Sequence, residues 1–381
     1  MDKKVIMSVF GTRPEAIKMA PLVRALQEDG RFQSLCCLTG QHREMLDSVM
    51  DIFRLHADYD LNIMEKNQTL STITTKTLLG MEKVIAEAKP DLILVHGDTT
   101  TTFAGALSAF YQKVPVGHVE AGLRTFDKYS PYPEEMNRNL VGKIAQLHFA
   151  PTRANADNLR REQLMGEIFI TGNTVIDAMK TTVAPDFRFS DERINQLDPS
   201  RRLIVMTCHR RENYGEPMAA IMRAVRRIAL ENPDLIVIYP VHLSPVVQQA
   251  AHEGLDGLDN VLLIDPIDVE QMHNLMARSY LVLTDSGGLQ EEAPALGKPV
   301  LVMRRETERP EAIHAGTARL VGVDEQAIVD AVENLLNSQD AYSQMAHAVN
   351  PYGDGNACSR IVRAIAWSFG METERPQDFI V

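Results

Sequence analysis

Three acidic side chains in the first half of the chain stand where an α/β protein places its ligands. Asp98 and Glu120 each follow a short apolar run typical of a buried strand, and Glu134 opens a helix behind a proline-stiffened loop. Ligands of α/β folds bind beyond the carboxyl ends of the strands. Because chemistry on a sugar commonly uses carboxylates in pairs, we expect these groups to act as acids or bases. In the competing, structural interpretation, Asp98 caps the following helix and Glu134 forms a solvated ion pair with Arg138.

The helix that Glu134 opens has a stripe of apolar residues along one side. The stripe consists of Met136, Leu140, Ile144 and Leu147. Glu134 and Arg138 are four residues apart and share the opposite face. We therefore expect the stripe to pack on the core and the two charged side chains to point away from it.

A glycine turn follows the first apolar run, and two cations lie close behind it. Gly11 permits close approach of the backbone, and Pro14 suits the first turn of a helix. Arg13 and Lys18 could reach an anion bound at that helix start. The arrangement predicts a site for a phosphorylated ligand; the alternative is an ordinary turn with solvated charges.

The second half of the chain supplies comparable groups. His209 follows the apolar run 203–206, and it could assist a leaving phosphate, although a single histidine is more often structural. After a later apolar run, a Ser-Gly-Gly turn opens a helix that carries Glu292. Free backbone amides in this turn would bind a diphosphate, and Glu292 would accept hydrogen bonds from ribose hydroxyls. A plain tight turn is the alternative. The cation-rich loop 304–311 follows the next strand.

Composition narrows the class of protein. The 381 residues are 45% hydrophobic, carry a formal charge of −12 and include four cysteines without metal-type spacing. General nucleic-acid binding would work against this negative field. The short apolar stretch after the N-terminus resembles neither a signal peptide nor a membrane span, so we expect a cytoplasmic protein with no metal site.

The elements that must position these residues alternate along the chain. Short apolar runs separated by helical patterns predict parallel sheets with crossover helices. The pattern breaks after Gly172 and then resumes, which predicts an N-terminal domain, 1–172, and a C-terminal domain, 173–356. Both would be doubly wound, with strand ends facing a shared cleft. The last helical pattern could close either domain; we expect 357–381 to complete the first.

Taken together, six motifs closely resemble those of the non-hydrolysing UDP-N-acetylglucosamine 2-epimerases, from about Val5 to Ile365. These motifs are residues 11–15 (Gly-Thr-Arg-Pro-Glu), 96–100 (His-Gly-Asp-Thr-Thr), 118–124 (His-Val-Glu-Ala-Gly-Leu-Arg), 133–135 (Pro-Glu-Glu), 209–212 (His-Arg-Arg-Glu) and 285–288 (Asp-Ser-Gly-Gly). The resemblance implies a glycosyltransferase-B type of architecture, two Rossmann-like domains with the active site in the interdomain cleft, and a homodimer.

The resemblance also implies an activity. The family interconverts UDP-GlcNAc and UDP-ManNAc for bacterial surface polysaccharides, through elimination of UDP to a 2-acetamidoglucal and re-addition with inversion at C2. It consumes neither a metal nor another cofactor.

By position, the residues matching the family's catalytic groups are Asp98, Glu120, Glu134 and His209. The residues expected to bind substrate are Arg13, Lys18, Arg138, Met272, Ser286, Gly287, Gly288, Glu292 and Arg309. The resemblance does not decide which of the three carboxylates, Asp98, Glu120 or Glu134, removes the C2 proton.

Several positions depart from the family pattern. Many members carry an aromatic residue near Met272, and Arg305-Glu306 replaces a more usual Asp-Thr pair. Members from Gram-positive bacteria bind a second UDP-GlcNAc as activator, and the positions that fit this site are Gln41, Arg210 and His242. Glu44 and Asn67 stand where glutamine and arginine are common, and an anionic Glu44 would disfavour the activator.

Three other functions compete with epimerisation. A hydrolysing relative would release free ManNAc and UDP. A UDP-sugar glycosyltransferase of the same architecture would use the Ser-Gly-Gly turn but could dispense with the carboxylates. A nucleotide-sugar sensor would give those carboxylates no role.

Overall fold

The computed structural model describes residues 3–40, 43–65 and 68–381, without the side chains of 43–45. The chain divides into two compact units. Unit 1 comprises Met1–Thr181 and Tyr352–Ile380, and unit 2 comprises Thr182–Pro351. The sequence pattern places the division after Gly172, whereas the contacts place it after Thr181, because α7 (Thr174–Thr182) packs almost wholly within unit 1.

Unit 1 contains a parallel sheet whose strand order is β3-β2-β1-β4-β5-β6-β7. Its strands are β1 (Lys4–Phe10), β2 (Phe32–Leu38), β3 (Tyr59–Asp60), β4 (Leu92–His96), β5 (Val116–Val119), β6 (Leu147–Ala150) and β7 (Glu167–Ile170). Its other helices are α1 (Arg13–Glu28), α2 (Arg43–Ile52), α3 (Leu70–Ala88), α4 (Thr100–Tyr111), α5 (Glu134–Ile144), α6 (Arg153–Arg161) and α16 (Ala357–Ser368).

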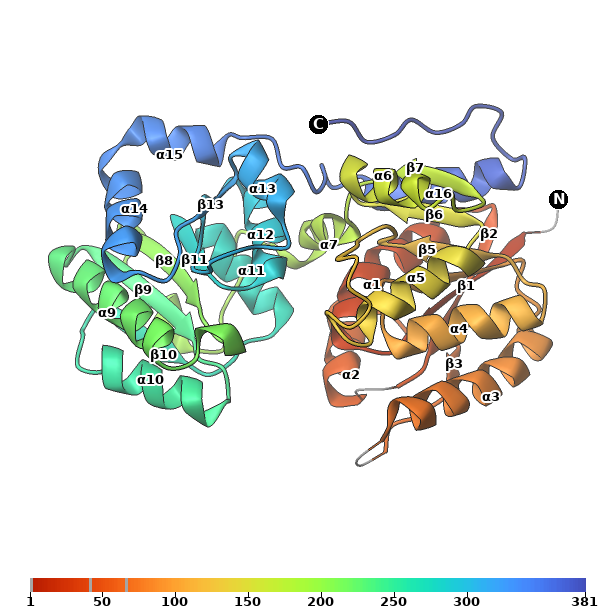
Figure 1. The fold of residues 1–381 in the computed structure, drawn as a ribbon, viewed down its shortest axis with the longest axis horizontal. Helices are drawn as coiled ribbons and strands as arrows, with labels where there is room; N and C mark the ends of the chain where they lie inside the picture. The colour runs from red at the N-terminus through yellow and green to blue at the C-terminus, as the bar shows by residue number, and fades with distance from the viewer. Residues whose placement is uncertain (1–2, 41–42, 66–67) are drawn as a thin grey trace. The chain divides into compact units, whose positions relative to one another are not determined.

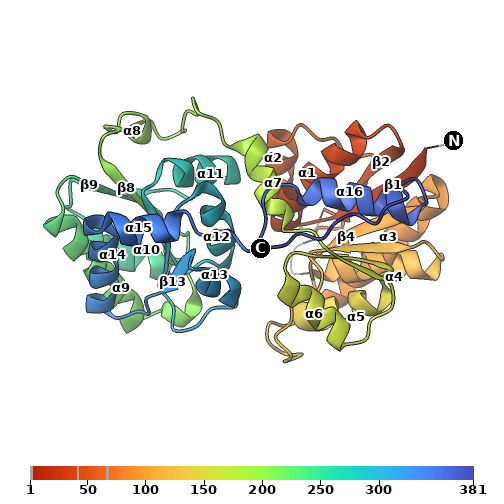
Figure 2. The same cartoon turned by 90° about the horizontal axis from the view of Figure 1, so that it is seen from above.

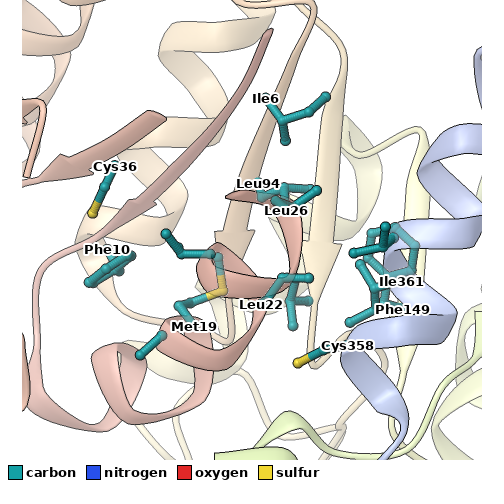
Figure 3. Close-up of a cluster of buried hydrophobic side chains, with 14 of the residues drawn as sticks. Ile6, Phe10, Met19, Leu22, Leu26, Cys36, Leu94, Phe149, Cys358 and Ile361 are labelled. Carbon is teal, nitrogen blue, oxygen red and sulfur yellow. The ribbon is translucent and has the colours of Figure 1, made fainter. Parts of the chain in front are cut away.

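Both faces of this sheet are covered, as the apolar runs predict. Side chains alternate across a strand, so Ile6 and Phe10 enter one core while Met7 and Val9 enter the other. The first core includes α1 and α16, whose side chains meet in Figure 3, and it also includes residues of α2. The second includes α3, α4 and α5, which lie side by side along the unit (Figure 1).

The C-terminal segment is part of unit 1. Helix α16 lies beside α1 (Figure 2) and buries Ile361 and Ile365 in the first core. Beyond it, the Phe379 amide donates to the Ile170 carbonyl at 2.7 Å, and the Ile170 amide donates to Asp378 at 2.9 Å. The tail therefore pairs with the outer strand β7 and covers that edge of the sheet.

Unit 2 has a second parallel sheet, of order β10-β9-β8-β11-β12-β13. Its strands are β8 (Arg202–Thr207), β9 (Leu235–Pro240), β10 (Val261–Ile264), β11 (Leu281–Thr284), β12 (Val300–Val302) and β13 (Ala318–Leu320). Its helices are α8 (Glu192–Asn195), η1 (Arg211–Asn213), α9 (Glu216–Glu231), α10 (Pro245–Leu255), α11 (Val269–Arg278), α12 (Gly287–Glu292), η2 (Ala293–Leu296), α13 (Pro310–Ala315), α14 (Glu325–Asn337) and α15 (Gln339–Ala346). The predicted pair of doubly wound parallel domains is confirmed.

Candidate active site

The glycine turn of unit 1 is built around a buried carboxylate. Glu15 accepts hydrogen bonds from the Gly11 and Thr12 amides at 3.0 and 2.8 Å, and its other oxygen accepts from Thr99 and Thr102, both at 2.8 Å. These bonds tie the start of α1 to the start of α4. Glu15 thus holds two strand-end loops together, a role that its sequence position signalled only as a helix capping box.

The side chain of Thr39, the residue after β2, limits position 11 to glycine. A Cβ on Gly11 would lie 1.7 Å from the Thr39 hydroxyl, which leaves no room for a side chain. The Thr39 side chain, which follows β2, therefore fills the space beside the turn where the predicted anion site begins.

The two cations behind the turn have different environments. Arg13 is half-buried, and no hydrogen bond or ion pair joins it to another residue that the structure describes. Lys18 forms an ion pair with Glu120. The side chain available to bind an anion is therefore Arg13, whereas Lys18 already neutralises a carboxylate.

Glu120 occupies a distinctive position after β5. Its backbone has φ +61°, a left-handed conformation that L residues seldom adopt, and its carboxylate faces Lys18 and His96. The His96 Nε2 atom lies 3.0 Å from Glu120 Oε2. Burial alone would raise the pKa of Glu120, but the charges of Lys18 and His96 and their hydrogen bonds hold this pKa well below its usual value. Glu120 is accordingly a stabilised anion.

Asp98 is bound from α5 rather than serving as a helix cap. Thr99 caps α4, and Asp98 forms an ion pair with Arg138, while the Asp98 carbonyl accepts a hydrogen bond from Asn137 at 2.9 Å. Arg138 also lies 3.2 Å from the buried Glu135. The two strand ends that carry Asp98 and Glu120 are neighbours, because β4 pairs with β5.

The predicted orientation of α5 is wrong. Arg138 is only 5% exposed, whereas Met136 and Leu140 are 38% and 39% exposed. The polar side of the helix is buried because Asp98 and the loop amides of Thr125 and Phe126 supply it with partners. Periodicity identifies the two faces of a helix but not the polar partners available to one of them.

Glu134 begins α5 and is half-buried. Arg138 turns toward Asp98 and Glu135, so the Glu134–Arg138 pair of the structural interpretation does not form. No ion pair or hydrogen bond joins the Glu134 side chain to any of the described residues. Among the three acidic candidates, it is the one whose carboxylate has no protein partner in the part of the chain that the structure describes.

In unit 2, Asp285 organises the ends of β8 and β11. This fully buried carboxylate accepts hydrogen bonds from the His209 and Arg210 amides, both at 2.8 Å, and from Asn213 at 3.1 Å. The sequence motif contained Asp285, but nothing in it indicated an anchor for the loop at 209–213. The loop is held so that the His209 ring remains partly exposed.

Ser286, Gly287 and Gly288 form the start of α12, directly after β11. A Cβ on Gly288 would lie 3.1 Å from Glu292 Oε1, so a side chain there would crowd that carboxylate. Glu292 ends the helix, and its Oε2 atom lies 3.4 Å from Nε2 of the fully buried His273. The predicted diphosphate turn and ribose carboxylate are therefore adjacent in the structure.

Arg309 and Met272, which are also predicted to bind substrate, lie in other segments of unit 2. Arg309 forms an ion pair with the buried Glu291, so part of its charge is already neutralised. Met272 lies on α11, half-buried, one residue before His273.

The predicted activator residues are described in part. The rings of His209 and His242 stack with centroids 5.5 Å apart, and a Cβ on Gly287 would lie 3.6 Å from Arg210. Burial lowers the pKa of His209, with Asp285 opposing and His242 and Arg210 adding to this effect. Gln41 and Asn67 lie outside the described residues.

A metal centre or a membrane-spanning helix would leave a signature among the residues that the structure describes. No group of three or more metal-ligating side chains occurs among them. None of their helices is both long and apolar enough to cross a membrane.

Comparisons with known proteins agree with these motifs. The family model described as UDP-N-acetylglucosamine 2-epimerase matches residues 24–366. The chain is 52% identical over 380 residues to the UDP-N-acetylglucosamine 2-epimerase of Bacillus subtilis, covering 100% of this chain and 99% of that protein.

Solved structures give the same result. S. aureus MnaA with UDP is 49% identical at a TM-score of 0.88, covering 99% of this chain and 100% of that one. The UDP-GlcNAc 2-epimerase of Neisseria meningitidis bound to UDP-GlcNAc is 46% identical at a TM-score of 0.85, covering 95% and 100%.

Proposed function

The chain belongs to the UDP-N-acetylglucosamine 2-epimerase family, an isomerase family, and from this premise we propose that it interconverts UDP-GlcNAc and UDP-ManNAc without net hydrolysis. The observation that carries this proposal is the pair of neighbouring strand ends presenting Asp98 and Glu120, with Glu134 on α5. Relatives of known structure were solved with UDP and with UDP-GlcNAc, which supports the same ligand class here.

The proposed reaction is an elimination followed by an addition. A carboxylate removes the C2 proton, the bond between C1 and the diphosphate oxygen breaks, and a double bond forms between C1 and C2. UDP then adds back to C1 while a proton is delivered to the other face of C2, which inverts that centre. No atom is gained or lost over the cycle.

The residues of unit 1 suit different parts of this reaction. A carboxylate whose pKa is held low is a weak base, so Glu120 is assigned to stabilising positive charge that develops at C1. The proton transfers at C2 then fall to Asp98 and Glu134. Arg13, which has no partner among the described side chains, is assigned to the departing diphosphate.

Unit 2 is assigned to the nucleotide. Ser286, Gly287 and Gly288 would donate backbone hydrogen bonds to the diphosphate, and Glu292 would accept from the ribose. His209 would approach the leaving phosphate. Met272 and Arg309 remain proposed contacts, although Arg309 must share its charge with Glu291.

The wider setting is also proposed. The enzyme is proposed to act in the cytoplasm as a homodimer that supplies polysaccharide synthesis and requires no cofactor, as the resemblance implies. A second UDP-GlcNAc would bind through Arg210, His242 and Gln41 as an activator, and the anionic Glu44, which stands where a glutamine is common, would weaken that binding.

Nuclear magnetic resonance of UDP-GlcNAc in deuterated buffer, without added metal or NAD, tests the proposal. Epimerisation predicts deuterium at C2 and a stable mixture of the two nucleotide sugars. Complete conversion to free ManNAc and UDP would instead identify a hydrolysing enzyme. Absence of both deuterium incorporation and UDP-ManNAc would refute the proposal.

Substitution of Asp98, Glu120 and Glu134, one at a time, by the matching amide tests the assigned roles. Each change should lower kcat by about a hundredfold or more, since acid–base groups typically contribute that much. Full turnover of UDP-GlcNAc in all three variants would favour a glycosyltransferase.

A further inference from the structure

A buried histidine lies next to Glu292, the carboxylate of unit 2 that is proposed to bind the ribose. His273, on α11, is 0% exposed and its two ring nitrogens face different partners. Nδ1 lies 2.6 Å from the Thr182 hydroxyl, and Nε2 lies 3.4 Å from Glu292 Oε2. Helix α11 packs against η2, the turn that directly follows Glu292.

The chemistry of the partners assigns the proton on this ring. A carboxylate only accepts, so the nitrogen facing Glu292 must be the one that carries hydrogen. In a neutral imidazole the other nitrogen is then an acceptor, and the Thr182 hydroxyl donates to it. The Thr182 hydroxyl therefore donates to Nδ1, and the Nε2–H of His273 faces Glu292 without yet forming a hydrogen bond to it.

The next residue holds the same chain segment. Asn274 donates to the Thr182 carbonyl at 2.7 Å and accepts from the Ala184 amide at 2.9 Å. Asn274 thus fixes the backbone from Thr182 to Ala184, which in turn positions the Thr182 hydroxyl beside the His273 ring. His273 contacts Glu292 through Oε2, while Oε1 lies toward Gly288 at the diphosphate turn.

We propose that His273 is a positioning residue that orients Glu292 for the ribose hydroxyls of the nucleotide, with Thr182 fixing its ring. This inference rests on the proposed nucleotide site of unit 2. The Nε2–Oε2 separation of 3.4 Å is longer than a good hydrogen bond, and on this proposal the bond forms once the ribose hydroxyls hold the carboxylate in place. His273 itself touches no substrate.

Calorimetric titration of the full-length protein with UDP and with 2′,3′-dideoxy-UDP tests this role. His273→Asn keeps a nitrogen near Thr182 but loses the donor toward Glu292, and His273→Gln keeps that donor. We expect His273→Asn to weaken UDP binding about tenfold, as loss of a supporting hydrogen bond does, and to leave dideoxy-UDP binding unchanged. His273→Gln should recover most of the UDP affinity.

Enzyme kinetics provide a second readout and His252 a control. His273→Asn should raise KM for UDP-GlcNAc with little change in kcat. His252 is an exposed histidine on α10 that pairs with Asp256, and His252→Asn should change neither nucleotide's affinity.

The outcomes separate the possible failures. Equal loss of affinity for both nucleotides, equal loss in the Asn and Gln variants, or no loss would overturn the positioning role while leaving the nucleotide site intact. If wild-type protein binds no UDP, the proposed site and this inference both fall. Should both His273 variants fail to fold, Thr182→Val removes only the hydroxyl; weaker binding of UDP alone supports the proposal, and unchanged UDP binding overturns it.

Discussion

At the scale of single residues, charge pairing distinguishes side chains that the motifs treat alike. Lys18 and Arg13 both follow the glycine turn, yet only Lys18 reaches Glu120. Lys18 and His96 both approach Oε2 of that carboxylate, so Oε1 has neither of these contacts. The lysine therefore acts on the protonation of Glu120, and Arg13 remains the cation suited to the diphosphate.

Replacing Lys18 should change the pH dependence of the enzyme. Lys18 lowers the pKa of Glu120 in the folded protein, so Lys18→Met should raise that pKa and move the acidic limb of kcat/KM to higher pH. The pH profile of UDP-GlcNAc epimerisation measures this shift. Lys4→Met is the matched control, because Lys4 pairs with Asp91 at the other end of β1; a limb that moves equally in both variants would contradict the assignment.

A second residue-scale prediction concerns His118 on β5. The ring is fully buried, donates to the Gly97 carbonyl at 2.7 Å, and its burial lowers the pKa to about 3. A histidine in the unfolded chain has a pKa of about 6.5. As the pH falls through that pKa, the unfolded chain binds a proton at His118 that the folded chain does not bind. The stability contributed by neutral His118 is complete above that pH and is lost below it.

Between pH 7 and pH 5.5 this loss should be about 1 kcal/mol. His118→Gln keeps an amide donor for Gly97 but does not titrate, so its unfolding free energy should fall less steeply over the same interval. Urea unfolding at the two pH values measures the difference. The exposed His56 gives the control, since His56→Gln should leave the slope unchanged; identical slopes for wild type and His118→Gln would exclude the effect.

At the scale of elements, the loops after the strands are positioned by buried polar anchors. Glu15 joins the starts of α1 and α4, Glu135 holds the loop before α5, and Asp285 holds the loop after β8. None of these carboxylates is itself proposed to react. The sequence motifs contain the reacting groups and their anchors together, and their separate roles emerge only from the hydrogen bonds.

Gly11 offers a test of how closely two strand ends must approach. Gly11→Ala places a methyl group against the Thr39 hydroxyl, so the start of α1 must shift and both stability and activity should fall, with a cost of about 1–3 kcal/mol. Removing the clashing oxygen in Gly11→Ala/Thr39→Ala should restore part of the loss. Thermal unfolding and kcat/KM measure both; a double variant no better than the single one would locate the cause elsewhere.

At the scale of the whole molecule, the end of the chain completes the unit with which the chain begins. Phe379 is buried against Ala121, Ala156 and Leu159, and Arg375 stacks over Phe169 with its guanidinium carbon 4.4 Å from the ring centre. Glu372 pairs with both Arg31 and Arg363. The tail thus covers an edge of the sheet and is joined by ion pairs to the turn before β2 and to α16.

Phe379→Ala should destabilise unit 1 by about 3 kcal/mol, the usual cost of truncating a buried phenylalanine. Ile380, which is 84% exposed, provides the neighbouring control, and Ile380→Ala should change little. Differential scanning calorimetry measures the unfolding transition, and UDP titration should show unchanged binding because Phe379 is not among the residues assigned to the nucleotide. Equal effects of the two substitutions would argue against the tail as a structural element.

The sequence alone determined the elements and which polar side chains follow the strands. Apolar runs of strand length, glycine turns and helix starts depend on local backbone preference, so both parallel sheets and the places of Asp98, Glu120, Glu134 and Ser286 were predictable. Tertiary structure decided the pairings. Lys18 forms an ion pair with Glu120, the buried Arg138 forms one with Asp98, and the His273 ring lies next to Glu292. These contacts join residues far apart in the chain, and their energies depend on desolvation and on partner geometry, which no local pattern records.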